Sequence, residues 1–446
     1  MDQRSVRDIL AGKTYFIRTF GCQMNQHDSE RVSGLLDSYG CLMALDPAHA
    51  DIVVFMTCCV REAADTRLYG QCNSCKSLPP SPSGKRVVAV GGCIAQRDGE
   101  GLLTNVDNVN VIFGTHSIAH VAELIAEAFR DGKRHIRTNE HEDTDAMSMP
   151  WHRETQYHAW VPIMTGCNNF CTYCVIPYTR GRIRSLPLDE MARQAAHLAA
   201  EGYRELVLTG IEIASYGRDL PGALTLADAV ETVAAAAPQM RLRLGSLEPT
   251  VITEDFCRRA AATGRVCRHF HLSLQSGCDR TLARMNRKYS TAEFLVCVER
   301  LRRYFPGCAL TADMITGFPG ETEEEFEDTI KLIEHVRYDA LFTFIFSPRG
   351  GTPAAKMEDP TPKEEKNRRF DRLCEVQNRI SLEIHQNYIG KTMLVLVDGK
   401  DGDQLTARTE GGRLVRMHGD DALIGQFVHA KITGCTTWSL VGELAE

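Results

Sequence analysis

Short apolar segments alternate with helical stretches along most of the chain, and this alternation limits the fold more strictly than any other feature of the sequence. In the first part of the chain, the segments rich in β-branched residues are 14–20, 51–56, 85–90 and 109–113. Helical stretches such as residues 27–39 lie between them. Short apolar runs separated by helices predict a parallel sheet with helices on both faces, and therefore a doubly wound α/β domain at residues 12–130.

The middle of the chain repeats this pattern. Its apolar segments are 159–164, 205–209, 242–245, 269–274, 309–314 and 341–346. Each is followed by a helical pattern, as at residues 321–336. Six strand–helix units predict a partial (βα)6 barrel within residues 154–387, with its chemistry at the carboxyl ends of the strands. The polar stretch at residues 131–153 has the composition of an interdomain linker.

The last part of the chain, residues 388–446, changes character. Its apolar segments are short, with glycine-rich turns between them, and lie at 392–397, 405–409, 414–417, 427–432 and 439–442. Short, evenly spaced strands of this kind are typical of a small antiparallel β-barrel.

Composition limits the classes of protein that this chain can belong to. It has 446 residues, a net charge of −7 and 17 cysteines. It lacks both an apolar run of membrane-spanning length and the apolar core of a secretory signal, and many cysteines in such a chain indicate a reducing compartment. We therefore expect a cytoplasmic, monomeric protein with no membrane partner. Its acidic charge argues against non-specific nucleic-acid binding, so the basic run at residues 180–184 is either a local RNA patch or a solvated loop.

Cys167, Cys171 and Cys174 follow the first strand of the predicted barrel with the spacing C-x3-C-x2-C. Three thiolates can hold an iron–sulfur cluster and leave one iron open, whereas a structural zinc site takes four ligands. The motif, with Gly166 and Pro177 beside it, resembles that of the radical S-adenosylmethionine (SAM) enzymes. This resemblance implies a 4Fe–4S cluster whose open iron binds SAM.

Cys22, Cys58 and Cys93 each follow a predicted strand of the first domain, which places them at one edge of its sheet. The segments around them, 19–25, 57–62 and 91–96, resemble the N-terminal signatures of the radical SAM methylthiotransferases. In that family the three cysteines hold a second, auxiliary 4Fe–4S cluster, and the resemblance implies the same role here.

Three further cysteines lie near this set. Cys59 is a rival to Cys58 as a cluster ligand, because the two are adjacent in the sequence. Cys72 and Cys75 form a C-x2-C pair, but no second pair follows at the spacing of a zinc site. The pair is either incidental or an accessory pair of thiols.

Polar residues at the ends of the predicted barrel strands are the candidate SAM contacts, since an unpaired polar group buried there would cost roughly 1–3 kcal/mol. These candidates are Gly210, Glu212, Ser246, Glu248, Gln275, Ser276 and Asp313. Hydroxyls and carboxylates suit the ribose and the amino group of SAM. Helix capping or pairing with the helix macrodipole is the alternative role for Glu248, and it is the role that we expect for Glu321.

The resemblance to the methylthiotransferases covers essentially the whole chain, and the last segment resembles the TRAM domain, an RNA-binding module. The candidate RNA contacts in that segment are Arg408, Arg413, Arg416 and Lys431, and a barrel that only caps the core is the alternative. The resemblance implies a tRNA methylthiotransferase with two 4Fe–4S clusters that uses SAM twice. It also implies tRNA as a partner and an electron donor such as flavodoxin or ferredoxin.

Two branches of the family compete for the substrate. Segments 19–25, 341–354 and 438–442 resemble the MiaB branch, which methylthiolates C2 of N6-isopentenyladenosine beside the tRNA anticodon. Segments 206–219 and 271–278 resemble the MtaB branch, which modifies N6-threonylcarbamoyladenosine. Because the flanking segments match in several separate places, we expect the MiaB type, with the MtaB type as the alternative.

Two hypotheses from other classes explain less of the sequence. A radical SAM enzyme of unrelated chemistry would leave Cys22, Cys58 and Cys93 without a role. A non-catalytic RNA-binding or zinc-storage protein would leave the open three-cysteine motif unexplained.

Overall fold

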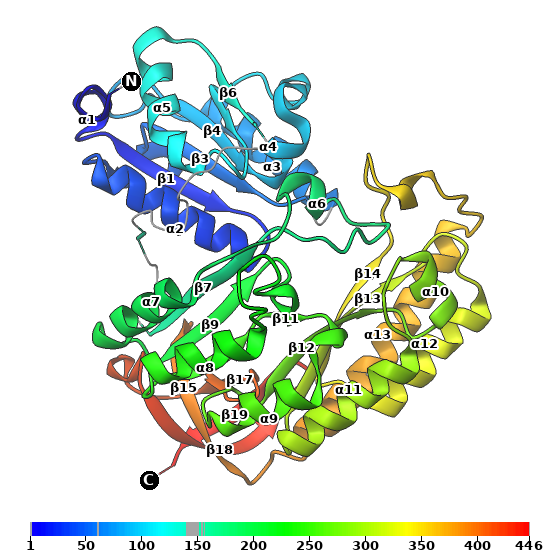
Figure 1. Cartoon of the computed structure of the whole chain (residues 1–446). Helices are drawn as coiled ribbons and strands as arrows, with labels where there is room; N and C mark the ends of the chain where they lie inside the picture. Colours follow the sequence, from blue (N-terminus) through cyan, green and yellow to red (C-terminus); the bar gives the residue numbers. More distant parts are fainter. Residues whose placement is uncertain (1, 60–61, 140–150, 153–154, 156, 446) are drawn as a thin grey trace. The chain divides into compact units, whose positions relative to one another are not determined.

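The computed structural model describes residues 2–59, 62–139, 151–152, 155 and 157–445. The chain divides into two compact units (Figure 1). Unit 1 comprises Met1–Glu154 together with Val175–Arg182, and unit 2 comprises Thr155–Cys174 together with Ile183–Glu446. The backbone therefore leaves unit 2 directly after Cys174 and returns to it at Ile183.

Unit 1 contains a six-stranded sheet in the order β2-β1-β3-β4-β5-β6, and every neighbouring pair is parallel. The strands are β1 (Thr14–Thr19), β2 (Leu42–Met43), β3 (Ile52–Thr57), β4 (Val87–Gly92), β5 (Val111–Phe113) and β6 (His135–Arg137). The helices are α1 (Gln3–Leu10), α2 (Gln23–Ser38), α3 (Glu62–Ser74), α4 (Cys93–Asp98), α5 (Val121–Asp131) and α6 (Ile176–Thr179).

The sheet of unit 1 is buried on both faces. Ile52 and Val54 of β3 pack into an apolar cluster with residues of α1, α2 and α5. Val53 and Phe55 of the same strand point the other way, into a second cluster with residues of α3 and α4. This period-two alternation between two apolar layers confirms the doubly wound fold.

Two elements of unit 1 differ from the sequence prediction. α1 precedes the predicted start of the domain, and β6 lies within the stretch that was predicted to be a linker. β6 joins the sheet because its backbone pairs with β5, although its own side chains are half-buried or exposed. Residues 140–150 of the predicted linker lie outside the described residues.

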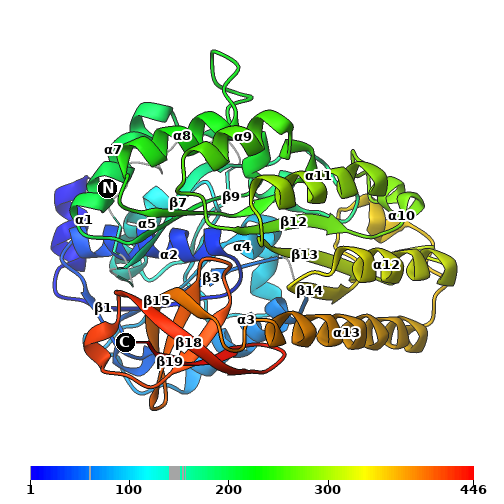
Figure 2. The same cartoon turned by 90° about the horizontal axis from the view of Figure 1, so that it is seen from below.

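Unit 2 contains the six predicted strand–helix units. Its strands are β7 (His158–Thr165), β8 (Arg184–Ser185), β9 (Glu205–Gly210), β10 (Arg241–Leu244), β11 (Ser246–Leu247), β12 (His269–Gln275), β13 (Ala309–Thr316) and β14 (Ala340–Ile345). Its helices are α7 (Leu188–Ala200), α8 (Leu226–Ala236), α9 (Glu254–Ala262), α10 (Asp279–Arg284), α11 (Thr291–Tyr304), α12 (Glu323–Val336) and α13 (Lys363–Gln386). The helices lie along the outer side of the strands (Figure 2).

Hydrogen bonding divides these strands into two four-stranded sheets, β10-β9-β7-β8 and β11-β12-β13-β14. β10 pairs with β9, and after Gly245 the chain continues as β11, which pairs with β12. The change of partner at Gly245 lets the strands curve into a partial barrel. Within each of the two sheets, the neighbouring strands of the six units pair in parallel, as the prediction requires. The short β8 runs antiparallel to β7.

The last segment forms a closed barrel in the order β15-β16-β17-β19-β18. Its strands are β15 (Thr392–Asp401), β16 (Gln404–Thr409), β17 (Leu414–Met417), β18 (Phe427–Cys435) and β19 (Leu440–Leu444). Its core includes Val395, Ala407, Val415 and Ile432, all fully buried. The prediction of an antiparallel barrel holds except at β17 and β19, which close the barrel as a parallel pair. Among the helices that the structure describes, none combines the length and the apolar character needed to span a membrane.

Candidate functional site

Unit 1 places Cys22, Cys58 and Cys93 at the carboxyl ends of three neighbouring parallel strands. Cys22 is the N-terminal cap of α2 after β1, Cys58 follows β3, and Cys93 opens α4 after β4. Because β1, β3 and β4 are adjacent in the sheet, the three thiols share one edge of it. Cys58 and Cys93 are buried, and Cys22 is exposed.

Two glycines allow the backbone to approach closely at this edge. At Gly21 (φ +112°), an added Cβ would lie 2.1 Å from Cβ of Cys58 and 2.7 Å from its Sγ. At Gly92 (φ +92°), an added Cβ would lie 2.5 Å from the carbonyl oxygen of Thr57. Since a side chain at either position would meet these atoms, the glycines keep the three-cysteine edge compact.

The thiols at this edge interact with one another. A hydrogen bond with Cys58 is the main cause that lowers the pKa of Cys22 to about 7. A hydrogen bond with Cys59 is the main cause that lowers the pKa of Cys93 to about 6, and the positive charge of Arg180 contributes. Thiolates are the form that binds iron, so two of the three predicted ligands are held close to their metal-binding state.

Among the described residues, no three His, Cys, Asp or Glu side chains converge as they would on a single metal ion. A 4Fe–4S cluster is larger, and each thiolate binds a different iron atom. Three thiols with no fourth ligand in the described part of the chain are the donor set of a cluster with one open iron, whereas a structural zinc site takes four ligands.

Cys59, which follows Cys58 in the chain, and the pair Cys72 and Cys75 are also buried. Cys59 is fully buried, and its pKa is raised well above the usual value, chiefly by its hydrogen bond to Cys93. Burial raises the pKa of Cys72 to about 12 and raises that of Cys75. Both belong to the apolar layer beside α3, as small buried side chains do.

Arg180 corrects one sequence-based expectation. Arg182 and Arg184 of the run at residues 180–184 are exposed, as either an RNA patch or a solvated loop requires, whereas the Arg180 side chain is 3% exposed and lies inside unit 1. Its Nε donates to Sγ of Cys93 at 3.3 Å, its Nη2 donates to Oδ1 of Asn25 at 2.8 Å, and its Nη1 lies 2.7 Å from Oδ2 of Asp28. A guanidinium held by a buried carboxylate and a thiol is not available to RNA.

In unit 2, the loop after β7 carries the other three cysteines. Cys167 and Cys171 are buried, and Cys174 is partly exposed. Gly166 (φ +75°) and Phe170 (φ +49°) adopt left-handed conformations that turn the loop. The strand end and this tight loop bring the C-x3-C-x2-C motif to the carboxyl side of the barrel strands, as predicted.

Residues just after α10 fix this loop. Asn286 donates to the carbonyl oxygen of Phe170 at 2.9 Å, and Met285 accepts from the backbone N–H of Thr172 at 3.1 Å. Arg287, 5% exposed, donates to Sγ of Cys171 at 3.3 Å. Arg287 could not be found from the sequence, because no periodic or spaced pattern marks a loop arginine more than 100 residues away from its thiol partner.

Two of the candidate SAM contacts lie beside the cysteine loop. Glu248 accepts a hydrogen bond from Asn169 at 3.2 Å and lies 3.7 Å from Arg287. Burial raises the pKa of Cys167 to about 11, and the charges of Glu212 and Glu248 add to this effect. These two carboxylates therefore border the loop, as the strand-end argument predicts.

One carboxylate oxygen of Glu212 is available to bind a ligand. One carboxylate oxygen accepts from Ser215, while the other, Oε1, is buried and has no hydrogen-bond partner among the described residues. Burial raises the pKa of Glu212 to about 7. A buried, unsatisfied carboxylate oxygen costs about 1–3 kcal/mol or more, so it suits a ligand that donates a hydrogen bond.

The remaining candidate SAM contacts differ in their burial and in the residues that they contact. Gln275 is 9% exposed and has a left-handed backbone (φ +75°), whereas Ser246 is exposed. Asp313 lies 3.1 Å from His271, and a Cβ at Gly210 would lie 2.8 Å from the backbone of Met164. The Ser276 hydroxyl lies 3.4 Å from Thr329 of α12 and accepts from the backbone N–H of Cys278, so its contacts are structural.

Glu321 lies just before the N-cap of α12 and does not cap the helix, so of its two expected roles capping is wrong, whereas pairing with the helix macrodipole stays a prediction. The cap is Thr322, which forms a capping box with Glu325. Glu321 instead accepts from the backbone N–H of Gly317 at 2.7 Å and lies 3.5 Å from Arg369, closing the turn between β13 and α12.

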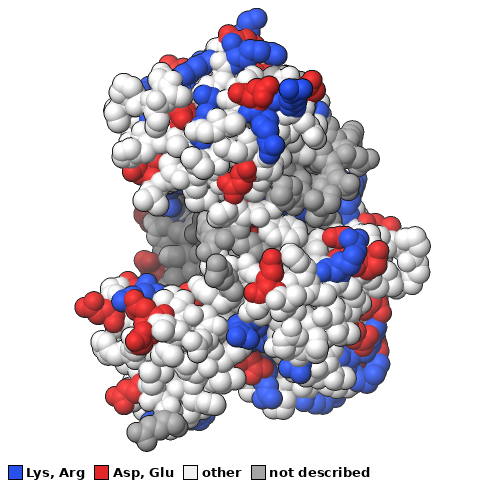
Figure 3. All heavy atoms as spheres, turned by 90° about the vertical axis from the view of Figure 1, so that its left-hand side faces the viewer, with Lys and Arg blue, Asp and Glu red and all other residues white. Residues whose placement is uncertain are grey.

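The predicted basic face of the barrel is weaker than expected. Arg413 is 7% exposed, pairs with Asp339 and lies 4.3 Å above the ring of Tyr388, so it is removed from any exposed face. Arg408 and Arg416 pair with Asp398 at 3.0 Å and Asp401 at 2.5 Å, and Lys431 is exposed. Basic and acidic side chains are interspersed on the face shown in Figure 3.

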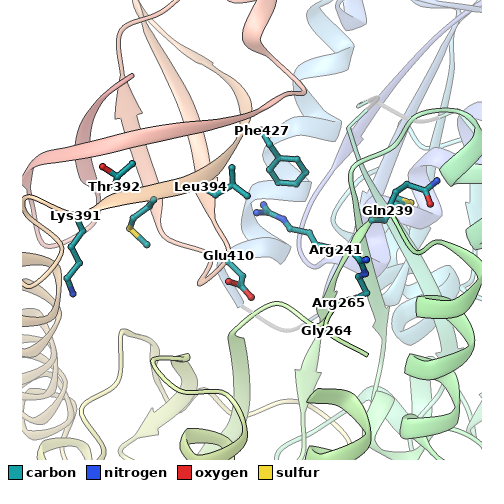
Figure 4. A pocket seen from close by; sticks show the side chains of 11 residues that line it. Gln239, Arg241, Gly264, Arg265, Lys391, Thr392, Leu394, Glu410 and Phe427 are labelled. Carbon is teal, nitrogen blue, oxygen red and sulfur yellow. The ribbon is translucent and has the colours of Figure 1, made fainter. Parts of the chain in front are cut away.

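A cavity of about 480 Å³ lies within unit 2, between the start of β10 and the barrel (Figure 4). Arg241 lies 5.0 Å from the centre of the Phe427 ring inside it. Arg265 and Lys391 also line the cavity and are exposed, with Glu410 as its acidic group. These two cations could not be found from the sequence, because they come from separate loops that only the fold brings together.

Comparison with known proteins agrees with this arrangement. Family models match residues 14–114 (Uncharacterized protein family UPF0004), 161–333 (Radical SAM superfamily) and 386–445 (TRAM domain). The chain is 40% identical over 444 residues to a protein of Clostridium botulinum (strain Loch Maree / Type A3) named tRNA-2-methylthio-N(6)-dimethylallyladenosine synthase, covering 98% of both chains. It is 39% identical over 440 residues to a protein of the same name from Carboxydothermus hydrogenoformans, covering 98% of this chain and 100% of the relative.

A solved structure shares the fold at low sequence identity. The radical S-adenosylmethionine methyltransferase TsrM from Kitasatospora setae superposes with a TM-score of 0.56 at 14% identity, over 77% of this chain and 74% of that one. The similarity over nearly the full length of the curated relatives decides the family, and their names do not favour the MtaB alternative. The chain belongs to the radical SAM methylthiotransferase family, within its MiaB-type branch.

Proposed function

We propose that this protein is a transferase that installs a methylthio group at C2 of N6-isopentenyladenosine beside the anticodon of tRNA, using SAM and two 4Fe–4S clusters. The observation that carries the proposal is the presence of two separate three-cysteine sets, one at a strand edge of unit 1 and one in the first barrel loop of unit 2. A radical SAM enzyme without sulfur transfer would need only the second set. Relatives that match along 98% of the chain carry the name of this reaction.

In unit 2, the loop cysteines would hold the cluster that binds SAM. Arg287 would hold the loop in position, since it donates both to Sγ of Cys171 and, at 2.6 Å, to the carbonyl oxygen of Ser273. The unsatisfied Oε1 of Glu212 would accept a hydrogen bond from the amino or ribose groups of SAM. Glu248, Gln275 and Asp313 would supply further acceptors at the same strand ends.

In unit 1, Cys22, Cys58 and Cys93 would hold the auxiliary cluster. When bound, the two clusters and SAM supply the electron, the radical and the methylthio group of the reaction. The residues of the chain then have three tasks: to hold the thiolates, to orient SAM and to place the tRNA base. Cys59 remains a hydrogen-bond partner of Cys93 in this scheme.

The tRNA backbone would be held by local cations, because the net charge of the chain is −7. Lys431 of the barrel, with Arg265 and Lys391 at the cavity, offers exposed positive charge that Arg413 does not. We expect the protein to act as a monomer in the cytoplasm and to take electrons from a flavodoxin or ferredoxin.

The test is anaerobic incubation of the reconstituted protein with SAM, a reductant and two tRNAs, followed by mass spectrometry of the nucleosides. One tRNA carries isopentenyladenosine and the other carries threonylcarbamoyladenosine beside the anticodon. We expect a methylthio mass gain only on the first. Gain only on the second would refute the substrate assignment, and formation of 5′-deoxyadenosine with no gain on either tRNA would refute methylthio transfer to both.

Matched cysteine variants separate the two sites. The Cys22→Ala, Cys58→Ala, Cys93→Ala variant is expected to form 5′-deoxyadenosine but no methylthio product. The Cys167→Ala, Cys171→Ala, Cys174→Ala variant is expected to form neither. If the first variant still gives methylthiolated tRNA, the role proposed for the unit 1 cysteines is wrong.

A further inference from the structure

Arg180 stands out among the buried charges of unit 1 because it touches a predicted cluster ligand. It is the sixth residue after Cys174 in the sequence, yet it belongs to unit 1. Its three nitrogens contact the Cys93 thiol, the Asn25 amide oxygen and the Asp28 carboxylate. Neither the family matches nor the cysteine motifs assign a role to this arginine.

The position of Arg180 is fixed by its own segment. Its backbone N–H donates to the carbonyl oxygen of Ile176 at 2.8 Å, and the Thr115 hydroxyl donates to the carbonyl oxygen of Thr179. Val175, at the start of the segment, packs into the apolar layer of α3 and α4. The guanidinium is therefore delivered to Cys93 by an anchored helical turn, which is α6.

Burying a guanidinium is costly, because its removal from water is only partly offset by a single ion pair. Asp28 is 2% exposed and balances the charge of Arg180, while Asn25 satisfies another nitrogen. The remaining nitrogen, Nε, points at sulfur. The ion pair of Arg180 and Asp28 is buried, and its Nε–H donor points at the Cys93 sulfur. This arrangement is better suited to setting the charge at that sulfur than to stabilising the fold.

We infer that Arg180 is a positioning residue that raises the reduction potential of the auxiliary cluster, and that Asp28 partly cancels this effect. The inference rests on the proposed function, since it takes Cys22, Cys58 and Cys93 as the cluster ligands. Hydrogen bonds to cluster sulfurs and nearby positive charge favour the reduced state, because reduction adds negative charge to the site. A carboxylate beside the arginine acts in the opposite direction.

This account predicts opposite effects for the two members of one ion pair. Removing the positive charge with Arg180→Met should shift the potential of the auxiliary cluster to more negative values. Removing the negative charge with Asp28→Asn should shift it to more positive values, because Arg180 and its bond to Cys93 remain. Arg180→Lys keeps the charge but not the forked geometry, so its potential should lie between those of the parent and Arg180→Met.

The experiment uses the full-length chain with Cys167, Cys171 and Cys174 replaced by alanine, so that only the auxiliary cluster forms. After anaerobic reconstitution, iron and sulfide are counted, and the potential is measured by a redox titration followed by electron paramagnetic resonance. Arg86→Met is the matched control. Arg86 is a partly buried arginine of unit 1 that binds backbone carbonyls just before β4, at the end of that strand opposite to Cys93.

The outcomes distinguish the inference from its premise. Shifts of opposite sign for Arg180→Met and Asp28→Asn, with none for Arg86→Met, would support it. Unchanged potentials, or shifts of the same sign, at full iron content would overturn the inference and leave the cluster assignment intact. If the parent binds no iron, the assignment of the three cysteines fails and the inference fails with it. If Arg180→Met loses its cluster, two measurements still test the inference. These are the sign of the potential shift in Asp28→Asn and the potential of Arg180→Lys.

Discussion

Replacement of Gly21 by alanine tests whether the three-cysteine edge depends on a close backbone approach. The new Cβ would lie 2.1 Å from Cβ of Cys58, whereas ordinary carbon–carbon contacts are about 3.5–4.0 Å. Either the Cys22 turn or the end of β3 must then move by more than an ångström. Such overpacking costs about 1–3 kcal/mol, and the positive φ adds about 1–2 kcal/mol for a residue with a side chain.

Gly12→Ala separates the two contributions, because Gly12 also has a positive φ (+76°) but has no atom within 4 Å of the position that the new methyl group would take. We expect Gly12→Ala to cost about 1–2 kcal/mol in urea unfolding and to keep about eight iron atoms per chain, four in each cluster. We expect Gly21→Ala to cost about 3 kcal/mol and to keep only the four irons of the unit 2 cluster. Equal stability and equal iron content in the two variants would refute the reasoning.

Three further variants test other parts of the structure. Burial raises the pKa of Glu321 to about 7 from 4.5, so the folded state holds a proton that the unfolded state has lost, and stability falls as the pH rises from about 4.5 to about 7. Glu321→Gln should remove this loss, so that its free energy of unfolding in urea rises relative to that of the parent by up to about 3 kcal/mol between pH 5 and pH 8. A difference between the two proteins that does not change with pH would contradict the assignment. Arg287→Lys should lower the iron held by the unit 2 cysteines and the yield of 5′-deoxyadenosine, while Arg258→Met, which removes an exposed pair with Asp255, should leave both unchanged. Arg413→Met should destabilise the chain by about 3–5 kcal/mol because it leaves Asp339 buried without its cation, whereas Arg408→Met should cost less than about 1 kcal/mol; equal costs would show that burial does not control the two pairs.

The sequence was sufficient to predict those elements whose own residues show that they are buried. β3 and β4 are continuous apolar runs because both of their faces are buried, and such runs can be found without knowing their neighbours. The positions of the two sets of three cysteines after strands could be predicted for the same reason, since cysteine spacing and strand ends are local features; their role as cluster ligands stays a prediction. β6 could not be predicted in this way, because its half-buried and exposed residues enter the sheet only through backbone pairing with β5.

The electrostatic details were beyond the reach of the sequence. Arg180 lies in a run of basic residues that is typical of an exposed loop, yet its partners Cys93 and Asn25 are 87 and 155 residues away. Arg413 was expected on an RNA-binding face, but it pairs with Asp339, 74 residues away. Charge patterning describes the neighbours along the chain, whereas burial depends on the neighbours in space.

The discontinuity of unit 1 has a consequence for biosynthesis. Because Val175–Arg182 belongs to unit 1, a fragment that ends at Glu154 would lack α6 and Arg180, and Asp28 would lose its cation. A ribosome makes the chain from its N-terminus, so this unit cannot finish folding until the cysteines of the other unit have also been synthesised. The surroundings of Cys93 therefore stay incomplete until the ribosome has also made the C-x3-C-x2-C motif and the short segment after it.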